Sequence, residues 1–351
     1  NGKRNGKGKE YFDGKLLFEG EYLNNKKWNG ILYGIIDNNN YEIKNGNGKV
    51  KEYYYKDKLK FEGEYKNGLK SGKGKEYDPF GRIEYEGDYI NGERNGIGKG
   101  MIKTDKLKYI GEYLNGMRNG KGKICYGDIL LFEGEYLYDQ KRKGKRYYDG
   151  ILKYEGEYLY DKKWNGKGYD KMGNIIYEII DGNGKIIEYW RGKIIFEGEY
   201  KNGKRNGKGK KYTESGKLIF EGEYLNDKKW NGIIYDPNNN SNKYEIKDGS
   251  GFIRIYGDYS LKFEGFYLNG ERNGKGKEYL SADRLIFEGE YLNGLKNGKG
   301  KEYDFHTGKL KIEGEYIEGI WNGMIKEFNF NGKLIRVSEY LKGKRISSKQ
   351  Y

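Results

Sequence analysis

The stretch Phe61-Glu-Gly-Glu-Tyr-Lys-Asn-Gly-Leu-Lys-Ser-Gly-Lys-Gly-Lys-Glu-Tyr77 decides the fold of this chain. Apolar and charged residues alternate over residues 59–65, as they do in a β-strand with one buried face. Residues 66–71 contain Asn67-Gly68, a dipeptide typical of tight hairpin turns, and residues 72–77 form a second alternating segment. The stretch therefore predicts a β-hairpin.

The two faces of this hairpin differ in chemistry, because successive side chains of a strand point to opposite sides. One face is predicted to carry rings over glycines, and the other a ladder of opposite charges. The first comprises Phe61, Gly63, Tyr65, Gly72 and Gly74, and the second comprises Glu62, Glu64, Lys73 and Lys75. Missing Cβ atoms would leave room for aromatic rings, while paired Glu and Lys side chains add about 0.2–1 kcal/mol each.

The same pattern recurs along the whole chain. Its central glycine is found at positions 20, 63, 87, 111, 134, 156, 198, 222, 265, 289 and 314, with most gaps between 22 and 25 residues and three gaps of 42 or 43. Each wide gap contains a shortened unit, at residues 41–53, 177–190 and 244–256. Residues 1–351 are thus predicted to form a single array of about eleven full units, three shortened units and a partial unit at each end.

A single hairpin is marginally stable in water, so the units must be stabilised by stacking on their neighbours. The predicted fold is all-β: an elongated, solenoid-like stack of antiparallel β-hairpins forming one twisted sheet.

Composition argues against an enzyme. Gly occurs 58 times and Tyr 38 times, with one Cys and one His among 351 residues. Cys125 is expected to be a small strand side chain and His306 to lie in a solvated loop, so no catalytic residue, metal site or cofactor is predicted. No segment is apolar enough to predict a transmembrane helix. Because the sequence starts at Asn1 inside a repeat, an N-terminal segment is expected to have been removed or left out.

The recurring Y/F-E-G-E-Y and N-G-x-x-N-G-K-G-K elements resemble the MORN repeat (membrane occupation and recognition nexus). The resemblance covers nearly the whole chain. It implies an elongated stack of hairpins used for scaffolding, dimerisation and, in some members, contact with anionic phospholipids. Tyr stands where MORN repeats usually have Trp after E-G-E, and the return strand G-K-G-K-E-Y is closest to the MORN-variant repeats of bacteria.

Two sets of residues are candidates for a binding surface. The first is the aromatic face, exemplified by Tyr65, Tyr200 and Tyr291, for which packing in the core is the competing interpretation. The second is a basic edge of hairpin tips that would suit an anionic membrane, with solubility as the competing interpretation. This edge comprises Lys26, Lys27, Arg94, Arg118, Lys204, Arg205 and Arg272.

Four tryptophans form a third candidate site. Trp28, Trp164 and Trp230 each lie in a Lys-Lys-Trp-Asn-Gly segment directly before a shortened unit, and Trp321 lies in a related segment near the C-terminus. Eight residues separate Tyr22 from Gly30, against seven from Tyr200 to Gly207, which predicts a turn one residue longer. We expect each ring to fill a notch left by a shortened hairpin; the alternative is an exposed anchor for a partner.

The sequence therefore favours a non-catalytic scaffold that binds a protein partner or associates with itself. The alternatives are peripheral binding of anionic phospholipid through the basic edge and polysaccharide binding by stacked aromatics. Nucleic acid is disfavoured because no recognition module is present. A cytoplasmic location is favoured, with peripheral attachment to a membrane as the alternative.

Overall fold

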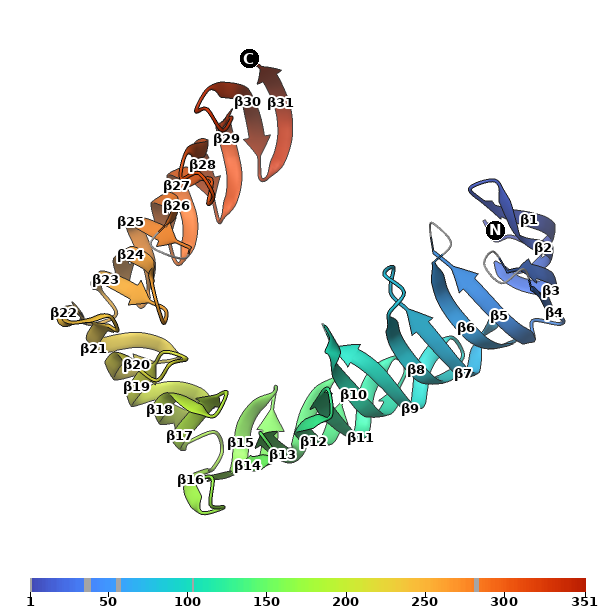
Figure 1. The fold of residues 1–351 in the computed structure, drawn as a ribbon, viewed down its shortest axis with the longest axis horizontal. Helices are drawn as coiled ribbons and strands as arrows, with labels where there is room; N and C mark the ends of the chain where they lie inside the picture. Colours follow the sequence, from blue (N-terminus) through green and yellow to red (C-terminus); the bar gives the residue numbers. More distant parts are fainter. Residues whose placement is uncertain (1, 35–38, 55–57, 103, 281–283) are drawn as a thin grey trace. The chain divides into compact units, whose positions relative to one another are not determined.

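A computed structural model describes residues 2–34, 39–54, 58–102, 104–280 and 284–351. All regular secondary structure in these residues is β-strand. The chain divides into two compact units, Asn1–Ile176 and Tyr177–Tyr351. Within each unit, successive hairpins follow one another in chain order (Figure 1). The all-β hairpin stack predicted from the sequence is confirmed.

The strands form four antiparallel sheets. The first sheet contains β1 (Gly6–Phe12), β2 (Lys15–Leu23), β3 (Lys26–Tyr33) and β4 (Asn40–Ile43). The second contains β5 (Gly48–Tyr53), β6 (Leu59–Lys66), β7 (Leu69–Tyr77), β8 (Ile83–Ile90), β9 (Glu93–Ile102), β10 (Thr104–Leu114), β11 (Met117–Tyr126), β12 (Ile129–Leu137), β13 (Gln140–Tyr148), β14 (Ile151–Leu159), β15 (Lys162–Tyr169) and β16 (Ile175–Ile179). The third contains β17 (Gly184–Trp190), β18 (Lys193–Lys201), β19 (Lys204–Tyr212), β20 (Leu218–Leu225), β21 (Lys228–Asp236) and β22 (Asn239–Ile246). The fourth contains β23 (Gly251–Tyr256), β24 (Leu261–Leu268), β25 (Glu271–Tyr279), β26 (Leu285–Leu292), β27 (Leu295–Tyr303), β28 (Leu310–Ile317), β29 (Ile320–Phe328), β30 (Leu334–Leu341) and β31 (Lys344–Gln350).

Tight two-residue turns join the two strands of each full hairpin. In the β6–β7 hairpin, Asn67 and Gly68 have φ angles of 53° and 71°, as a type I′ turn requires. The amide of Gly68 donates to the carbonyl of Gly46 in the preceding turn, and the amide of Gly92 donates to the carbonyl of Lys70. The turns are therefore hydrogen-bonded to one another as well as to their own strands.

The core of each repeat is a ring packed over two facing glycines. Gly63 pairs with Gly74 across β6 and β7, and the Phe61 ring lies on both. A Cβ added to Gly74 would come within 2.6 Å of the Phe61 ring, so no larger residue fits there. Gly72 differs from the prediction: it lies in a bulge with a φ of +67°, and a Cβ there would meet the Glu64 carboxylate instead of a ring.

The rings also contact one another from repeat to repeat. In the Asn1–Ile176 unit, edge-to-face contacts link successive rings at centroid distances of 5.0 to 5.6 Å. This series runs through Phe61, Tyr89, Tyr85, Tyr113, Tyr109, Tyr136, Phe132, Tyr158 and Tyr154. Each such pair contributes about 0.5–1.5 kcal/mol beyond the burial of its area, so this row joins the repeats in addition to the strand pairing between them.

The shortened units divide what was predicted as one sheet into four. At each of them the pairing next to the turn is reduced to one isolated bridge, between Lys44 and Asn47 in the first. Aliphatic side chains replace the ring over glycines here: Ile43 and Val50 are buried in the first shortened unit, and Ile246 and Ile253 in the third. Because Val50 stands opposite Gly63, the close approach of two glycines is lost at this point.

The other face of the sheets carries the predicted ladder of charges. Lys75 pairs with Glu86 at 3.1 Å across β7 and β8, and Lys210 pairs with Glu221 at 3.1 Å across β19 and β20. These pairs are partly exposed to solvent, so each adds little to stability. The aromatic face therefore holds the fold together, and the charged face is the solvated one.

The ring-over-glycine packing predicts a large effect of a single methyl group. Gly74→Ala should lower the free energy of unfolding by about 1–3 kcal/mol, because the added Cβ overlaps the Phe61 ring. Gly257→Ala is the matched control, since its Cβ would meet only the flexible Lys262 side chain. Thermal unfolding of both variants measures the difference, and equal midpoints would contradict the packing.

Candidate binding surfaces

A cation covers the core ring of most repeats. Lys70 Nζ lies 4.3 Å from the centroid of the Phe61 ring, and Arg205 Cζ lies 4.4 Å from that of Phe196. The cation always follows its ring by nine residues. The other such pairs are Phe18 with Lys27, Tyr85 with Arg94, Tyr109 with Arg118, Phe132 with Lys141, Tyr154 with Lys163, Phe220 with Lys229, Phe263 with Arg272, and Phe287 with Lys296.

A glutamate of the return strand neutralises these cations in several repeats. Glu76 accepts from Lys70 at 2.6 Å and from Arg94 of the next hairpin at 2.5 Å. Burial alone would raise the pKa of the Glu76 carboxyl, but Lys70 and Arg94 more than offset it and hold that pKa below its ordinary value. Arg205 pairs with Glu188 and Arg272 with Glu278 in the same way.

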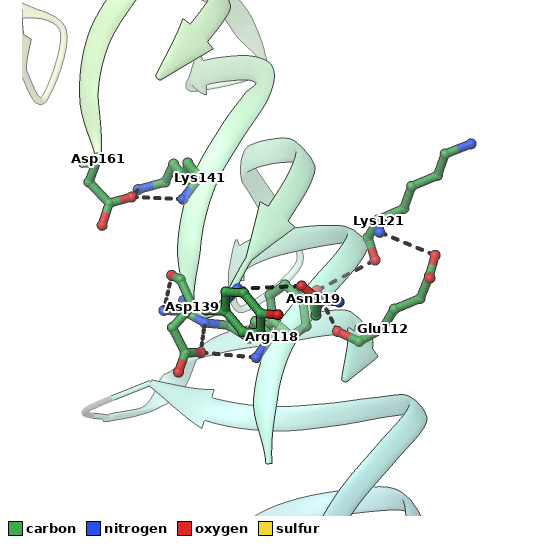
Figure 2. Close-up of polar contacts among 9 residues, drawn as sticks. Glu112, Arg118, Asn119, Lys121, Asp139, Lys141 and Asp161 are labelled. Carbon is green, nitrogen blue, oxygen red and sulfur yellow. Dashed lines mark hydrogen bonds and ion pairs between the residues drawn. The ribbon is translucent and has the colours of Figure 1, made fainter. Parts of the chain in front are cut away.

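In two hairpins without this glutamate, an aspartate in the next turn takes its place. Figure 2 shows Arg118 donating to Asp139 and Lys141 to Asp161. The Arg118 Nε to Asp139 Oδ1 distance is 2.8 Å. Ile124 occupies the position of the glutamate beside Arg118, so the turn aspartate supplies the missing acceptor.

The basic edge expected from the sequence is therefore mostly engaged inside the repeats. Lys27, Arg94, Arg118, Arg205 and Arg272 are half-buried, each over a ring and beside a carboxylate. Lys26 lies against the turn at Gly68, with its Nζ 3.4 Å from the Asn67 carbonyl oxygen, whereas Lys204 is exposed. This corrects the expectation of a free ridge of charge. The constant spacing of nine residues from ring to cation was the signal in the sequence that pointed to stacking.

The candidate tyrosines also belong to the core. Tyr65 and Tyr200 are half-buried and donate hydrogen bonds to Glu52 and Glu188, and Tyr291 is 4% exposed. Burial raises the pKa of Tyr200, and the charge of Glu188 and the hydrogen bond to Glu188 raise this pKa further. Few of their ring atoms are available to stack on a sugar.

The tryptophans occupy two different positions. Trp28 and Trp230 lie against Gly46 and Gly249 in the turns of the shortened units, where an added Cβ would come within 2.9 and 2.8 Å of the ring. Trp164 is half-buried on β15. Trp321 stands instead at the position of a covering cation, nine residues after Ile312, and its ring contacts Tyr340 at 5.1 Å.

The longer turn predicted for the tryptophan hairpins is wrong. Leu23 pairs with Lys26 as Lys66 pairs with Leu69, so both turns contain two residues. Gly30 pairs with Gly20 and thus takes the place of Gly74, which leaves Trp28 in a one-residue bulge of the return strand. The turns also remain hydrogen-bonded through the shortened unit, from Gly46 N–H to the Trp28 carbonyl.

The solvated face contains two grooves with floors of glycine backbone. The groove that lies later in the chain, called the second groove, has a volume of about 720 Å³ and crosses β23 to β29. Its lining includes Gly265, Gly276, Gly289, Gly300 and Gly314 below walls of Lys and Glu. The first groove, also about 720 Å³, has a floor that includes Gly63, Gly74, Gly87 and Gly98, and its apolar lining includes Ile97 and Ile110.

Exposed apolar side chains line both grooves where the repeat normally carries charge. Phe252 and Phe266 are 44% and 53% exposed and pair across β23 and β24 with ring centroids 5.3 Å apart. The equivalent pair in the next repeat is Lys275 with Glu290. Met324, 55% exposed, faces Glu339 in the same way. Neither composition nor periodicity singled out these residues; their signal was an apolar residue in place of a ladder charge.

The described residues offer little for catalysis. They contain no group of three or more His, Cys, Asp and Glu side chains that could hold a metal ion. His306 is exposed in a turn whose amides donate to Asp304, and Cys125 is half-buried.

Comparison with known families identifies the repeat. The MORN repeat matches residues 1–15, 61–79, 85–99, 109–128, 196–217, 263–281 and 287–304. The chain is a MORN-repeat protein. Six of the matched segments begin at the core ring of a full hairpin, whereas the three shortened units and the full hairpins beginning at Phe18, Phe132, Tyr154 and Phe220 lie outside the matches.

The other comparisons give no information on the function of this MORN array. No curated protein matches the sequence. A crystal structure titled TcdB2-TccC3-TEV aligns with 96% of this chain at 11% identity and a TM-score of 0.18, and a structure of the Photorhabdus luminescens Tc holotoxin pore aligns with 97% at 13% identity and 0.15. This chain spans 19% and 21% of the length of those chains. At these TM-scores the likeness supports no conclusion. No helix long and apolar enough to cross a membrane occurs in the ranges that the structure describes.

The Glu76 network of this MORN array predicts a pH-dependent stability. Because the folded-state pKa of Glu76 is lowered, its stabilisation is present above the ordinary value of 4.5 and is lost as the pH falls through the folded-state value. Glu76→Gln should therefore lower the free energy of unfolding by about 1–3 kcal/mol at neutral pH, and by progressively less in acid. Glu64→Gln, at an exposed carboxylate on the other face, is the control. A pH-independent loss in Glu76→Gln would contradict the network.

The tryptophan positions predict a structural role for two rings. Trp28→Ala and Trp230→Ala should each cost on the order of 3 kcal/mol, because each ring packs on the glycine of a shortened turn. Trp190→Ala, at a ring that is 47% exposed, should cost far less. Thermal unfolding and acrylamide quenching measure the two effects. Unchanged stability with readily quenched emission would instead support partner anchors.

Proposed function

We propose that this MORN-repeat protein is a non-catalytic scaffold that binds a segment of a partner protein in the second groove. The supporting observation is the exposed Phe252–Phe266 pair, which replaces a Lys–Glu pair of the ladder. Both rings are about half exposed on the solvated face, and adjacent exposed rings are frequent anchors in protein interfaces.

The shape of the groove suggests the form of the partner segment. Its floor crosses five adjacent strands, from Gly265 on β24 to Gly314 on β28. Strand spacing of about 4.8 Å makes this roughly 19 Å, the length of about six residues of extended chain. Walls of both Lys and Glu favour a segment with apolar anchors flanked by charges of both signs.

The alternative functions depend on groups that the fold already uses. Anionic phospholipid would need cations that are free to leave their partners, but Arg94, Arg205 and Arg272 are stacked on rings and paired with glutamates. Polysaccharide would need exposed aromatic faces, but the repeated Phe and Tyr rings are buried. Both considerations support the protein-binding proposal over its alternatives.

Restoring the ladder should abolish binding without unfolding the protein. The double variant Phe252→Lys/Phe266→Glu reinstates the charge pair found at Lys275 and Glu290. A photo-crosslinker at Met324 should capture a protein from native cell extract in the otherwise unchanged chain, and the double variant should lose this capture while keeping its thermal midpoint. Phe330→Glu, at a ring 73% exposed outside the groove, should retain capture.

Two results would contradict the proposal. One is equal capture by the double variant. The other is binding to vesicles of phosphatidylserine and phosphatidylcholine that is unchanged in the double variant, with no crosslinked protein. Capture of a second copy of the chain itself would identify self-association as the interaction that the groove mediates.

A further inference from the structure

Two lysines come together at a position where several repeats pair a cation with a carboxylate; Arg146 holds the same position between Phe132 and Tyr154. Lys211 on β19 stands opposite Phe196 and Phe220, as Glu76 stands opposite Phe61 and Tyr85. Lys229 on β21 is the cation over the Phe220 ring, at 5.1 Å. The usual acceptor is therefore replaced by a second donor.

The first tryptophan hairpin, which contains Trp28, has an acceptor that the hairpin containing Trp230 lacks. There, Lys27 Nζ lies 3.2 Å from Glu10 Oε2, and the Tyr22 hydroxyl donates to the same oxygen at 3.0 Å. Lys229 and Tyr224 are the counterparts of Lys27 and Tyr22, since they pair in the same register. The position of their common acceptor, however, is occupied by Lys211, which can only donate.

The Tyr224 hydroxyl has no acceptor among the described residues, as is also the case for Tyr89, Tyr136, Tyr158 and Tyr291. The Tyr224 side chain is 4% exposed, and its hydroxyl oxygen is buried. A buried hydroxyl without a partner costs about 1–3 kcal/mol. No turn aspartate compensates as Asp139 does for Arg118, because Gly249 stands at the corresponding turn position.

The electrostatics of the cluster agree with its geometry. Burial and then the charge of Lys211 lower the pKa of Lys229 to about 7. Burial and then the charge of Arg205 lower the pKa of Lys211, while Glu188 opposes this. Glu188 is itself paired with Arg205 at 2.7 Å, so the cluster of Lys211, Lys229 and Tyr224 has donors in excess.

We propose that Lys211, Lys229 and Tyr224 bind a small inorganic anion, which takes the role played by Glu10 in the first tryptophan hairpin. Two ammonium groups and one hydroxyl supply donors from three adjacent strands, and the half-buried position strengthens each interaction relative to water. The site belongs to the aromatic face and is independent of the grooves.

Thermal unfolding of the full chain in different sodium salts tests the site. In gluconate, a bulky organic anion used as the reference, Lys211→Glu should have a higher midpoint than wild type, because it recreates the carboxylate pairing. Chloride or sulfate at the same ionic strength should raise the midpoint of wild type with increasing concentration and leave that of Lys211→Glu unchanged. Lys204→Glu makes the same change of charge at an exposed position of β19 and should respond as wild type does.

Two further measurements examine the donors. Tyr224→Phe should keep the fold and weaken the binding of the active anion, titrated by calorimetry, by roughly tenfold, because it removes one donor to a charged ligand. Binding to wild type should also weaken between pH 6 and pH 8 as Lys229 loses its proton. Equal midpoint responses of wild type and Lys211→Glu, or equal affinities of wild type and Tyr224→Phe, would overturn the proposal.

Discussion

The structure depends on the contact between an aromatic ring and two facing glycines. Glycine pairs such as Gly63–Gly74 let the ring lie flat on two strands at once, and the ring of the next hairpin meets its edge. Since no hairpin has a second layer of its own, this row of rings supplies the buried area that an isolated hairpin lacks. The repeated glycines, the edge-to-face contacts and the tight turns all follow from this one arrangement.

A third layer completes the core above the rings. In most repeats a Lys or Arg nine residues after the ring covers its outer surface, and in several of them a glutamate or a turn aspartate neutralises the cation. Because part of the 68 Lys and Arg side chains belong to this layer, they do not all contribute to a basic surface. This layer also explains Trp321: the ring beneath is replaced by Ile312, and an indole covers an aliphatic side chain without needing a carboxylate.

Several residues depart from the repeat pattern, and each departure changes the local structure or chemistry of the array. Val50 and its counterparts each replace one glycine of a facing pair on the strand that begins a new sheet. Phe252 and Phe266 interrupt the charge ladder and expose rings, and Lys211 removes an acceptor from the core. Each of these residues replaces one that would fit the packing or the charge pairing of the repeat. Each position is therefore a candidate for a function that the other repeats do not share.

The sequence by itself determined the hairpins, their turns and the division of faces, because period-two alternation and Asn-Gly dipeptides act over a few residues. Phe61 over Gly63 and the Lys75–Glu86 ladder were predictable for that reason. Only the tertiary structure decided the register: it placed Gly30 opposite Gly20, moved Gly72 into a bulge and divided the predicted single sheet into four. It likewise turned Arg94, Arg205 and Arg272 from an expected basic edge into covers for rings. These positions depend on where a bulge falls in the pairing of the two strands of a hairpin, and a bulge changes the register without changing the alternation that the sequence shows along each strand.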